Sequence, residues 1–222
     1  MLALGIHFGH DASVSVCSPE GVLFSLQEER LSRIKHHCGF PRRSLELALA
    51  RYGQLGRAIP IVAFSTSEVI LPEHQHAWLV PADRERTPII GVTGDGQRLA
   101  GIRDKVQRTW KEFASRHWCE HMDWMRDAGL LRDDVTHYYV AHHRAHASGA
   151  FRLCGVSGAV TVLSCDGKGD GLSAAIYRGG EDGRLTCLRG STPQHSVGMF
   201  YQAVTEALGF IPVDGEYKTM GL

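Results

Sequence analysis

The first 27 residues alternate apolar with small or polar side chains, and two turns interrupt the pattern. Leu2, Leu4 and Ile6 take every second position before the turn Gly9-His10-Asp11, and the alternation resumes at Val14. A second turn, over 19–21, precedes the apolar run 22–26. A period of two is typical of strands that bury one face. Residues 2–27 are therefore predicted to form a three-stranded meander.

Helical and strand patterns alternate along the rest of the chain, which predicts an α/β fold. A helix is expected to open at Pro41, with Leu45, Ala48, Leu49 and Tyr52 on one face. Further helices are predicted over 102–128, over 142–153 and from Val197. Strands are predicted over 59–64, 135–140, 159–164, 172–177 and 185–188. The polar segment 67–98, rich in proline and glycine, is predicted to be a long excursion.

Composition excludes several classes of partner. The 222 residues contain 24 Lys and Arg against 24 Asp and Glu, so the basic excess typical of nucleic-acid binding is missing. No apolar run approaches the ~20 residues that cross a bilayer, and no signal-peptide core is present. The six cysteines form no CxxC pair, which argues against a thiolate zinc site. We expect a cytoplasmic protein with no nucleic-acid or membrane partner, and the sequence leaves homo-oligomerisation open.

Two short acidic, glycine-containing segments, Gly9–Ser13 and Asp166–Gly171, each lie between two predicted strands. Such turns expose backbone N–H groups to phosphate, a hydroxyl such as that of Ser13 can donate to phosphate oxygens, and a carboxylate can hold a divalent cation. Each segment alone also fits an ordinary hairpin turn. Because both follow the first strand of a hairpin, we predict that Asp11 meets Asp166 or Asp170 across one polyphosphate pocket.

His142 and His146 follow a predicted strand and are four residues apart. On a helix they share a face, so that both imidazoles can bind one metal ion. The alternative is a helix start with solvated imidazoles. Two histidines do not complete a metal site, and a third ligand, a carboxylate that the spacing does not name, must come from elsewhere.

Six sequence blocks resemble the O-carbamoyltransferases of the nodulation-factor and antibiotic-tailoring group. They occur in the family's order and span the chain, and residues 67–135 contribute no site residue to the resemblance. The blocks are 5–13 (GIHFGHDAS), 28–41 (from EERLSRIKH to the FP pair at 40–41), 142–147 (HHRAHA), 165–171 (CDGKGDG), 195–201 (HSVGMFY) and 215–222 (GEYKTMGL).

The resemblance implies an actin-like ATPase and sugar-kinase fold, of ribonuclease-H-like type, similar to the catalytic domain of the tRNA threonylcarbamoyl-adenosine enzymes. In the family a separate C-terminal domain makes carbamoyl-adenylate from carbamoyl phosphate and ATP. The domain resembled here passes the carbamoyl group to a hydroxyl of a sugar, an antibiotic or another small natural product. The implied cofactors are ATP and a divalent metal, which is Fe, Mg, Mn or Zn.

The resemblance also assigns roles to individual residues. His142 and His146 match the metal-binding pair, and the metal would polarise the carbamoyl-adenylate or orient its phosphate. The candidate catalytic residues are His10 and Asp11. The role of His10 as general base on the acceptor hydroxyl is expected from its position and from the chemistry of imidazole, and not from the resemblance. The nucleotide- and phosphate-binding positions are Asp11, Ser13, Asp166, Gly167, Gly169, Asp170, Gly171 and Lys218.

Members of the family continue well past the motif that ends at Leu222. Residues 1–222 are therefore expected to be an inactive N-terminal portion of the catalytic domain, one lobe with the start of a second near 190–222. The adenylate-forming domain and a distal carboxylate ligand would be absent. An exposed apolar stripe is expected at Val197, Phe200, Tyr201, Val204 and Leu208. The alternatives are an ATP-dependent kinase or ATPase of the same superfamily and a non-catalytic assembly lobe.

Overall fold

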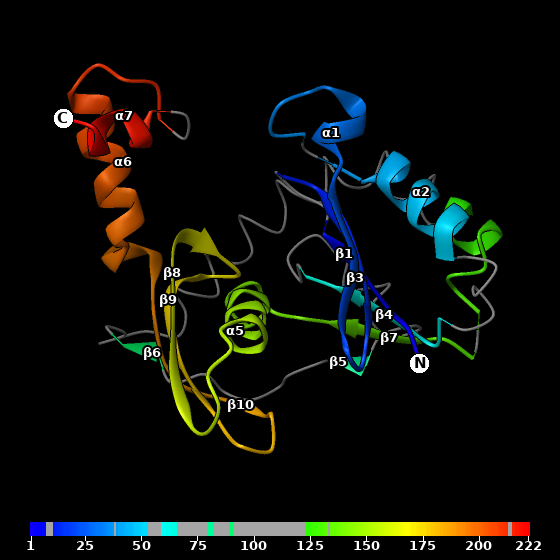
Figure 1. The fold of residues 1–222 in the computed structure, drawn as a ribbon. Coiled ribbons are helices and arrows are strands. Elements are labelled where there is room, and N and C mark those ends of the chain that lie inside the picture. The colour runs from blue at the N-terminus through cyan, green and yellow to red at the C-terminus, as the bar shows by residue number, and fades with distance from the viewer. Residues whose placement is uncertain are drawn as a thin grey trace, which may run out of the picture. The chain divides into compact units, whose positions relative to one another are not determined.

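The computed structural model is a mixed α/β structure whose two compact units are described separately (Figure 1). The first unit comprises Met1–Arg84 and Gly101–Ala141, and the second comprises Glu85–Ala100 and His142–Leu222. The structure describes residues 1–7, 11–37, 39–52, 59–65, 80–81, 89–90, 123–132, 134–212 and 215–222.

A six-stranded sheet forms the centre of the first unit. Its strands are β1 (Ala3–His7), β2 (Ser13–Ser18), β3 (Gly21–Gln27), β4 (Ile61–Phe64), β5 (Val80–Pro81) and β7 (Thr136–Tyr139). They lie in the order β3-β2-β1-β4-β7-β5. β1, β2 and β3 pair antiparallel, which confirms the predicted meander. β4 pairs parallel with β1, and β7 continues the parallel part of the sheet.

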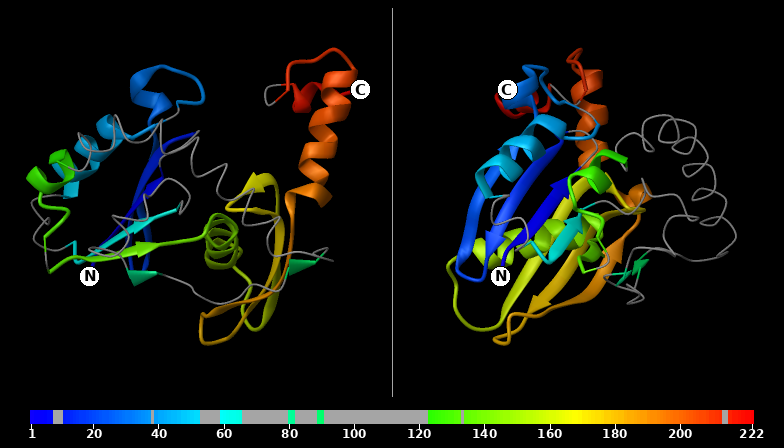
Figure 2. Two further views of the ribbon diagram at one scale, coloured as in Figure 1. Left: turned by 180° about the vertical axis from the view of Figure 1, so that it is seen from behind. Right: turned by 90° about the vertical axis from the view of Figure 1, so that its right-hand side faces the viewer.

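The alternating residues of the meander form the core of this unit. Leu4, Ile6 and Val14 are fully buried, whereas their neighbours along the strands are partly exposed. The predicted helix is α2 (Arg42–Tyr52), which packs on β2 and β3 and buries Leu45 and Ala48 (Figure 2). The buried face of the meander and the apolar face of α2 therefore pack together in one core.

The N-terminus of helix α2 is capped by a carboxylate from another segment. Its first turn carries no acidic residue, but Glu28, next to the short helix α1 (Glu29–Ser32), is 2% exposed. The Glu28 carboxylate accepts the backbone N–H groups of Arg43 at 3.1 Å and of Ser44 at 2.8 Å. These N–H groups have no partner within the helix, and negative charge at a helix N-terminus is favourable.

Replacing Glu28 is expected to destabilise the chain far more than replacing a surface glutamate. Glu28→Ala leaves two N–H groups unsatisfied, one of them from a fully buried serine, and should lower the free energy of unfolding by about 1–3 kcal/mol. Glu46→Ala removes only an exposed ion pair with Arg42 on the same helix and should cost less than about 0.5 kcal/mol. Denaturant unfolding measures both, and equal losses would contradict the capping role of Glu28.

The second unit is built on a four-stranded sheet of order β6-β10-β9-β8. Its strands are β6 (Ile89–Ile90), β8 (Val160–Gly169), β9 (Leu172–Gly179) and β10 (Leu185–Ser191). Its helices are α5 (His142–Leu153), η2 (Pro193–His195), α6 (Val197–Ala207) and α7 (Glu216–Met220). α5 packs on β8 and β9 around a small core that includes Ala147, Val162 and Tyr177 (Figure 1).

Strand β8 is longer than the predicted strand 159–164. It continues to Gly169, so that the segment from Asp166 to Gly169 is strand and the turn is reduced to Asp170 and Gly171. Gly169 pairs with Leu172, and a register shift between Cys165 and Gly169 accommodates the glycine-rich stretch. Because glycine is usually a turn signal, this extension was not predicted.

Other predictions fall partly outside the described residues. The excursion 67–98 is described only at β5 and β6, both of which pair into sheets. The helix 102–128 is described only from residue 123, and 123–127 are helical. In the described part of the chain, no helix has the length and apolar character needed to cross a membrane.

The predicted apolar stripe on α6 is exposed. The exposed fraction is 67% for Val197 and 70% for Phe200, and Tyr201 and Leu208 are also exposed. Val204 is partly buried. The neighbouring α7 adds the exposed Tyr217. These side chains therefore present apolar surface on the second unit.

Candidate metal centre

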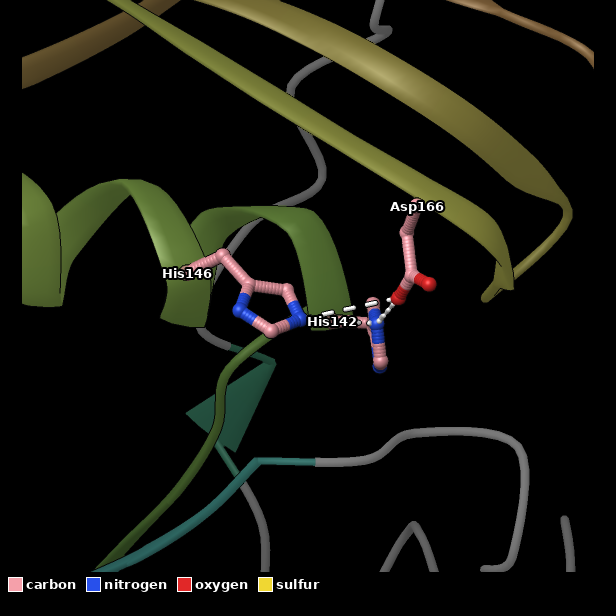
Figure 3. A group of neighbouring side chains, drawn as sticks. All are labelled: His142, His146 and Asp166. Atoms are coloured by element: carbon pink, nitrogen blue, oxygen red, sulfur yellow. Dashed lines mark hydrogen bonds and ion pairs between the residues drawn. The ribbon is translucent and has the colours of Figure 1, made fainter. Parts of the chain in front are cut away.

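Two histidines one turn apart open helix α5. The Nε2 atoms of His142 and His146 lie 3.0 Å apart, and the ring centroids are separated by 4.6 Å. Their i, i+4 spacing places both imidazoles on one face of the helix, as predicted (Figure 3). His142 is the more enclosed of the two, because its side chain is 16% exposed and that of His146 is 57% exposed.

Asp166 on β8 completes a group of three potential metal ligands. Its Oδ2 atom lies 2.6 Å from Nε2 of His142 and 3.6 Å from Nε2 of His146 (Figure 3). All three ligand atoms lie within 4.8 Å of one another. The hydrogen bond from His142 and the nearby imidazole of His146 hold the pKa of the Asp166 carboxyl well below its usual range, although partial burial opposes them. The carboxylate is therefore ionised at neutral pH.

This donor set fits a first-row divalent metal. Imidazole nitrogens with one carboxylate oxygen are typical ligands of Zn²⁺ and Fe²⁺, whereas Mg²⁺ prefers oxygen ligands alone. Ligands at about 2.1 Å from a shared ion lie about 3.0–3.4 Å apart, which agrees with the separation of the two Nε2 atoms. Asp166 Oδ2 lies just outside this range from both rings, at 2.6 Å from His142 Nε2 and 3.6 Å from His146 Nε2, so that small side-chain adjustments would let the three residues hold a metal.

From the sequence, Asp166 is expected in the phosphate-facing turn, and the spacing of the histidines does not name a third metal ligand. The structure brings the carboxylate of Asp166 to the two histidines instead of leaving it in a loop. The signal available in the sequence was an acidic residue at the far end of the strand that follows the histidine helix. Only the packing of α5 on β8 identifies it.

His143, which the sequence analysis did not single out, ties α5 to the same strand. It is 1% exposed, and its Nδ1 atom lies 2.8 Å from Oγ of Ser164. Burial lowers the pKa of His143, so that its imidazole is neutral at neutral pH. Because Ser164 and Asp166 are two apart on one strand, they face α5 together.

The N-terminus of α6 anchors the backbone around Asp166. Ser196 accepts the N–H of Met199 at 3.0 Å as a helix cap, and its hydroxyl lies 2.7 Å from the carbonyl oxygen of Gly167. A Cβ atom at Gly198 would lie 2.8 Å from Cα of Gly167, closer than real contacts allow. α6 and β8 therefore touch backbone to backbone.

Two glycine-to-alanine substitutions in helices of the second unit should have opposite effects. Gly198→Ala forces β8 and α6 apart and is expected to lower the free energy of unfolding by about 1–3 kcal/mol. Gly149→Ala, on α5 with open space around it, should raise it by about 0.5–1 kcal/mol through helix propensity. Thermal or denaturant unfolding measures both, and a stabilising Gly198→Ala would refute the close contact.

The pH dependence of stability should report the charge of Asp166. Because the folded pKa is lowered, its contribution is present above the unfolded value of about 3.9 and is lost as the pH falls towards the folded value. In chelator-treated protein, the difference in unfolding free energy between wild type and Asp166→Asn should be larger at pH 5 than at pH 2.5. A difference independent of pH would contradict the ionised pair.

The remaining predicted site residues have distinct positions. Asp11 has a φ of 58°, and its Oδ1 atom lies 2.9 Å from Nδ1 of His36, with Glu29 completing a second group of potential ligands. Ser13 is the first residue of β2. Lys218, exposed on α7, lies over the ring of Phe210.

Some predictions about these residues remain untested. His10, the predicted general base, lies outside the described residues. Asp11 belongs to the first unit, whereas Asp166 and Asp170 belong to the second. Their meeting across one pocket stays a prediction.

Comparison with known proteins identifies the family. The model of the carbamoyltransferase N-terminus matches residues 2–222. The chain belongs to this family. The carbamoyltransferase N-terminus domain is 28% identical to an uncharacterized protein of Methanocaldococcus jannaschii over 221 residues, which cover 100% of this chain and 33% of that protein.

Two further relatives have similar coverage. An uncharacterized protein of Synechocystis is 27% identical over 99% of this chain and 34% of its own length. Nodulation protein NolNO of Sinorhizobium fredii is 27% identical over 97% of this chain and 28% of its own. The carbamoyltransferase N-terminus domain thus spans about a third of the length of these relatives.

Proposed function

We propose that this domain transfers a carbamoyl group to a hydroxyl of a small molecule such as a sugar, an antibiotic or another natural product. The carbamoyl donor is carbamoyl-adenylate, made from carbamoyl phosphate and ATP. Membership of the carbamoyltransferase family supports carbamoyl transfer in general. The observation that carries the site is the group His142, His146 and Asp166, a ligand set that a kinase or ATPase of the same superfamily would not need.

The proposed reaction is a substitution at the carbamoyl carbon. The acceptor hydroxyl oxygen forms a bond to this carbon, and the bond from the carbon to the phosphate oxygen of the adenylate breaks. AMP leaves with the electron pair, and the hydroxyl proton passes to a base, for which we propose His10. A divalent metal bound by His142, His146 and Asp166 would supply Lewis-acid polarisation of the donor.

The two hairpin turns support a nucleotide site. Asp11 between β1 and β2 and Asp170 between β8 and β9 both have positive φ values, 58° and 48°. In each unit, a positive φ at an aspartate is typical of a tight turn that exposes backbone N–H groups. We propose that the acidic turns, together with Ser13, Gly167, Gly169, Gly171 and Lys218, contact the nucleotide.

The strand order also supports the proposed actin-like, ribonuclease-H-like fold. In the first unit an antiparallel meander is followed by strands parallel to its first strand, in the order β3-β2-β1-β4-β7. Helix α2 packs on β2 and β3 of this sheet.

The function is tested by supplying the donor in two forms. Labelled carbamoyl phosphate with ATP, or preformed carbamoyl-adenylate, is incubated with the protein and a panel of sugar and antibiotic alcohols. We expect carbamoylated product from preformed carbamoyl-adenylate when this domain is assayed within the full-length protein, and none from residues 1–222 alone. Phosphorylated acceptor from ATP would instead support a kinase, and release of carbamate without acceptor product in both arms would contradict transfer.

Replacing one histidine of the proposed site should weaken metal binding, whereas replacing a histidine elsewhere in the domain should not. His146→Ala is expected to weaken binding of Co²⁺ or Zn²⁺ by more than about 10-fold and to reduce carbamoyl transfer in parallel. His195→Ala, an exposed histidine of η2, should leave metal affinity unchanged. Calorimetric titration of the chelator-treated protein measures the affinities, and equal affinity for wild type and His146→Ala would refute the ligand assignment.

A further inference from the structure

The main chain of His142 is bound by the carboxylate of Asp170. Oδ2 of Asp170 accepts the backbone N–H of His142 at 2.6 Å. His142 is the first residue of α5, and the first turn of this helix contains no acidic residue. Its N–H group has no partner within the helix, and a carboxylate at this place is favoured by the helix dipole. Asp170 therefore caps the N-terminus of α5.

The residue before Asp170 leaves room for the imidazole of His142. A Cβ atom added to Gly169 would overlap the ring atoms of His142. The Nε2 atom of the same ring faces Asp166 at 2.6 Å. One short stretch, from Asp166 to Asp170, thus binds the main chain and a ring nitrogen of this histidine and leaves room for its ring.

We propose that Asp170 is a positioning residue of the metal site, which fixes His142 for metal binding through the N–H of that residue. This inference rests on the proposed function of His142, His146 and Asp166 as metal ligands. It gives Asp170 a role in addition to the proposed nucleotide contact, because its carboxylate oxygen accepts the N–H of His142. Groups that orient metal ligands in this way typically change metal affinity about 10- to 100-fold when removed.

The turn allows the acceptor to be removed without strain. Asp170 and Gly171 have φ values of 48° and 78° and join the paired residues Gly169 and Leu172, as in a two-residue type I′ turn. Asparagine and glycine both tolerate this conformation. Asp170→Asn keeps an acceptor oxygen and loses the charge, whereas Asp170→Gly loses both.

The experiment is a Co²⁺ titration of chelator-treated wild type and both variants, followed by visible absorption, with a thermal melt of each protein. We expect Asp170→Gly to weaken Co²⁺ binding about 10- to 100-fold and to alter the absorption spectrum, and Asp170→Asn to bind within about threefold of wild type. Asp182→Gly removes an aspartate that accepts a backbone N–H in the next hairpin. It should leave Co²⁺ affinity unchanged whatever it does to stability.

Several outcomes overturn the inference. If Asp170→Asn weakens Co²⁺ binding about 10-fold or more relative to wild type, the charge and not the acceptor matters. This comparison with wild type decides the question even where the glycine variant does not fold. If Asp170→Gly folds and binds Co²⁺ like wild type, Asp170 does not position His142. The proposal that His142, His146 and Asp166 bind a metal is then unaffected. If wild type binds no Co²⁺, the proposed metal site fails and the inference fails with it.

Discussion

Carboxylates supplied to helix N-termini by other segments organise both units of this domain. Neither α2 nor α5 has an acidic residue in its first turn. The Glu28 carboxylate accepts two N–H groups in the first turn of α2. The Asp170 carboxylate accepts the N–H of the first residue of α5. Unsatisfied N–H groups at a helix end are costly to bury, so each carboxylate fixes the start of its helix on the neighbouring sheet. The register of every side chain on α5, including the histidine pair, follows from that start.

The candidate metal centre forms where one face of helix α5 meets one face of strand β8. His142 and His143 on α5 face Asp166 and Ser164 on β8, which are two residues apart on the same side of the strand. His142 and Asp166 offer metal ligands. His143 and Ser164 form a buried polar contact that holds α5 against β8. The exposed Cys165 lies between them in sequence and points to the opposite face. A slip of β8 by one residue would exchange these faces and remove Asp166 from the site.

Local patterns in the sequence predicted helices and strands correctly where a single periodicity runs through the whole segment. The alternation at Leu4 and Ile6 predicted the meander, and α5 begins and ends at the predicted residues, His142 and Leu153. The spacing of His142 and His146 likewise predicted their common face. These features depend on neighbours along the chain, which the sequence displays directly.

Features that depend on tertiary contacts were missed. The glycines around Asp166 were interpreted as turn residues, but Gly169 lies in β8 beside the imidazole of His142. Gly198 is required by backbone contact with β8, which no helical pattern reveals. Asp166 meets the histidines only through the packing of α5 on β8. In each case the residue type was visible, but the partner that gives it meaning lies elsewhere in the fold.

The bond between Asp170 and His142 also has a consequence for local motion. Amide protons of a first helical turn ordinarily exchange with solvent quickly, because nothing within the helix holds them. In α5 the first of these amides is bonded to a carboxylate, whereas the last residue, Leu153, is 72% exposed. The bond to Asp170 therefore opposes fraying at the N-terminal end of α5, where the two histidines lie.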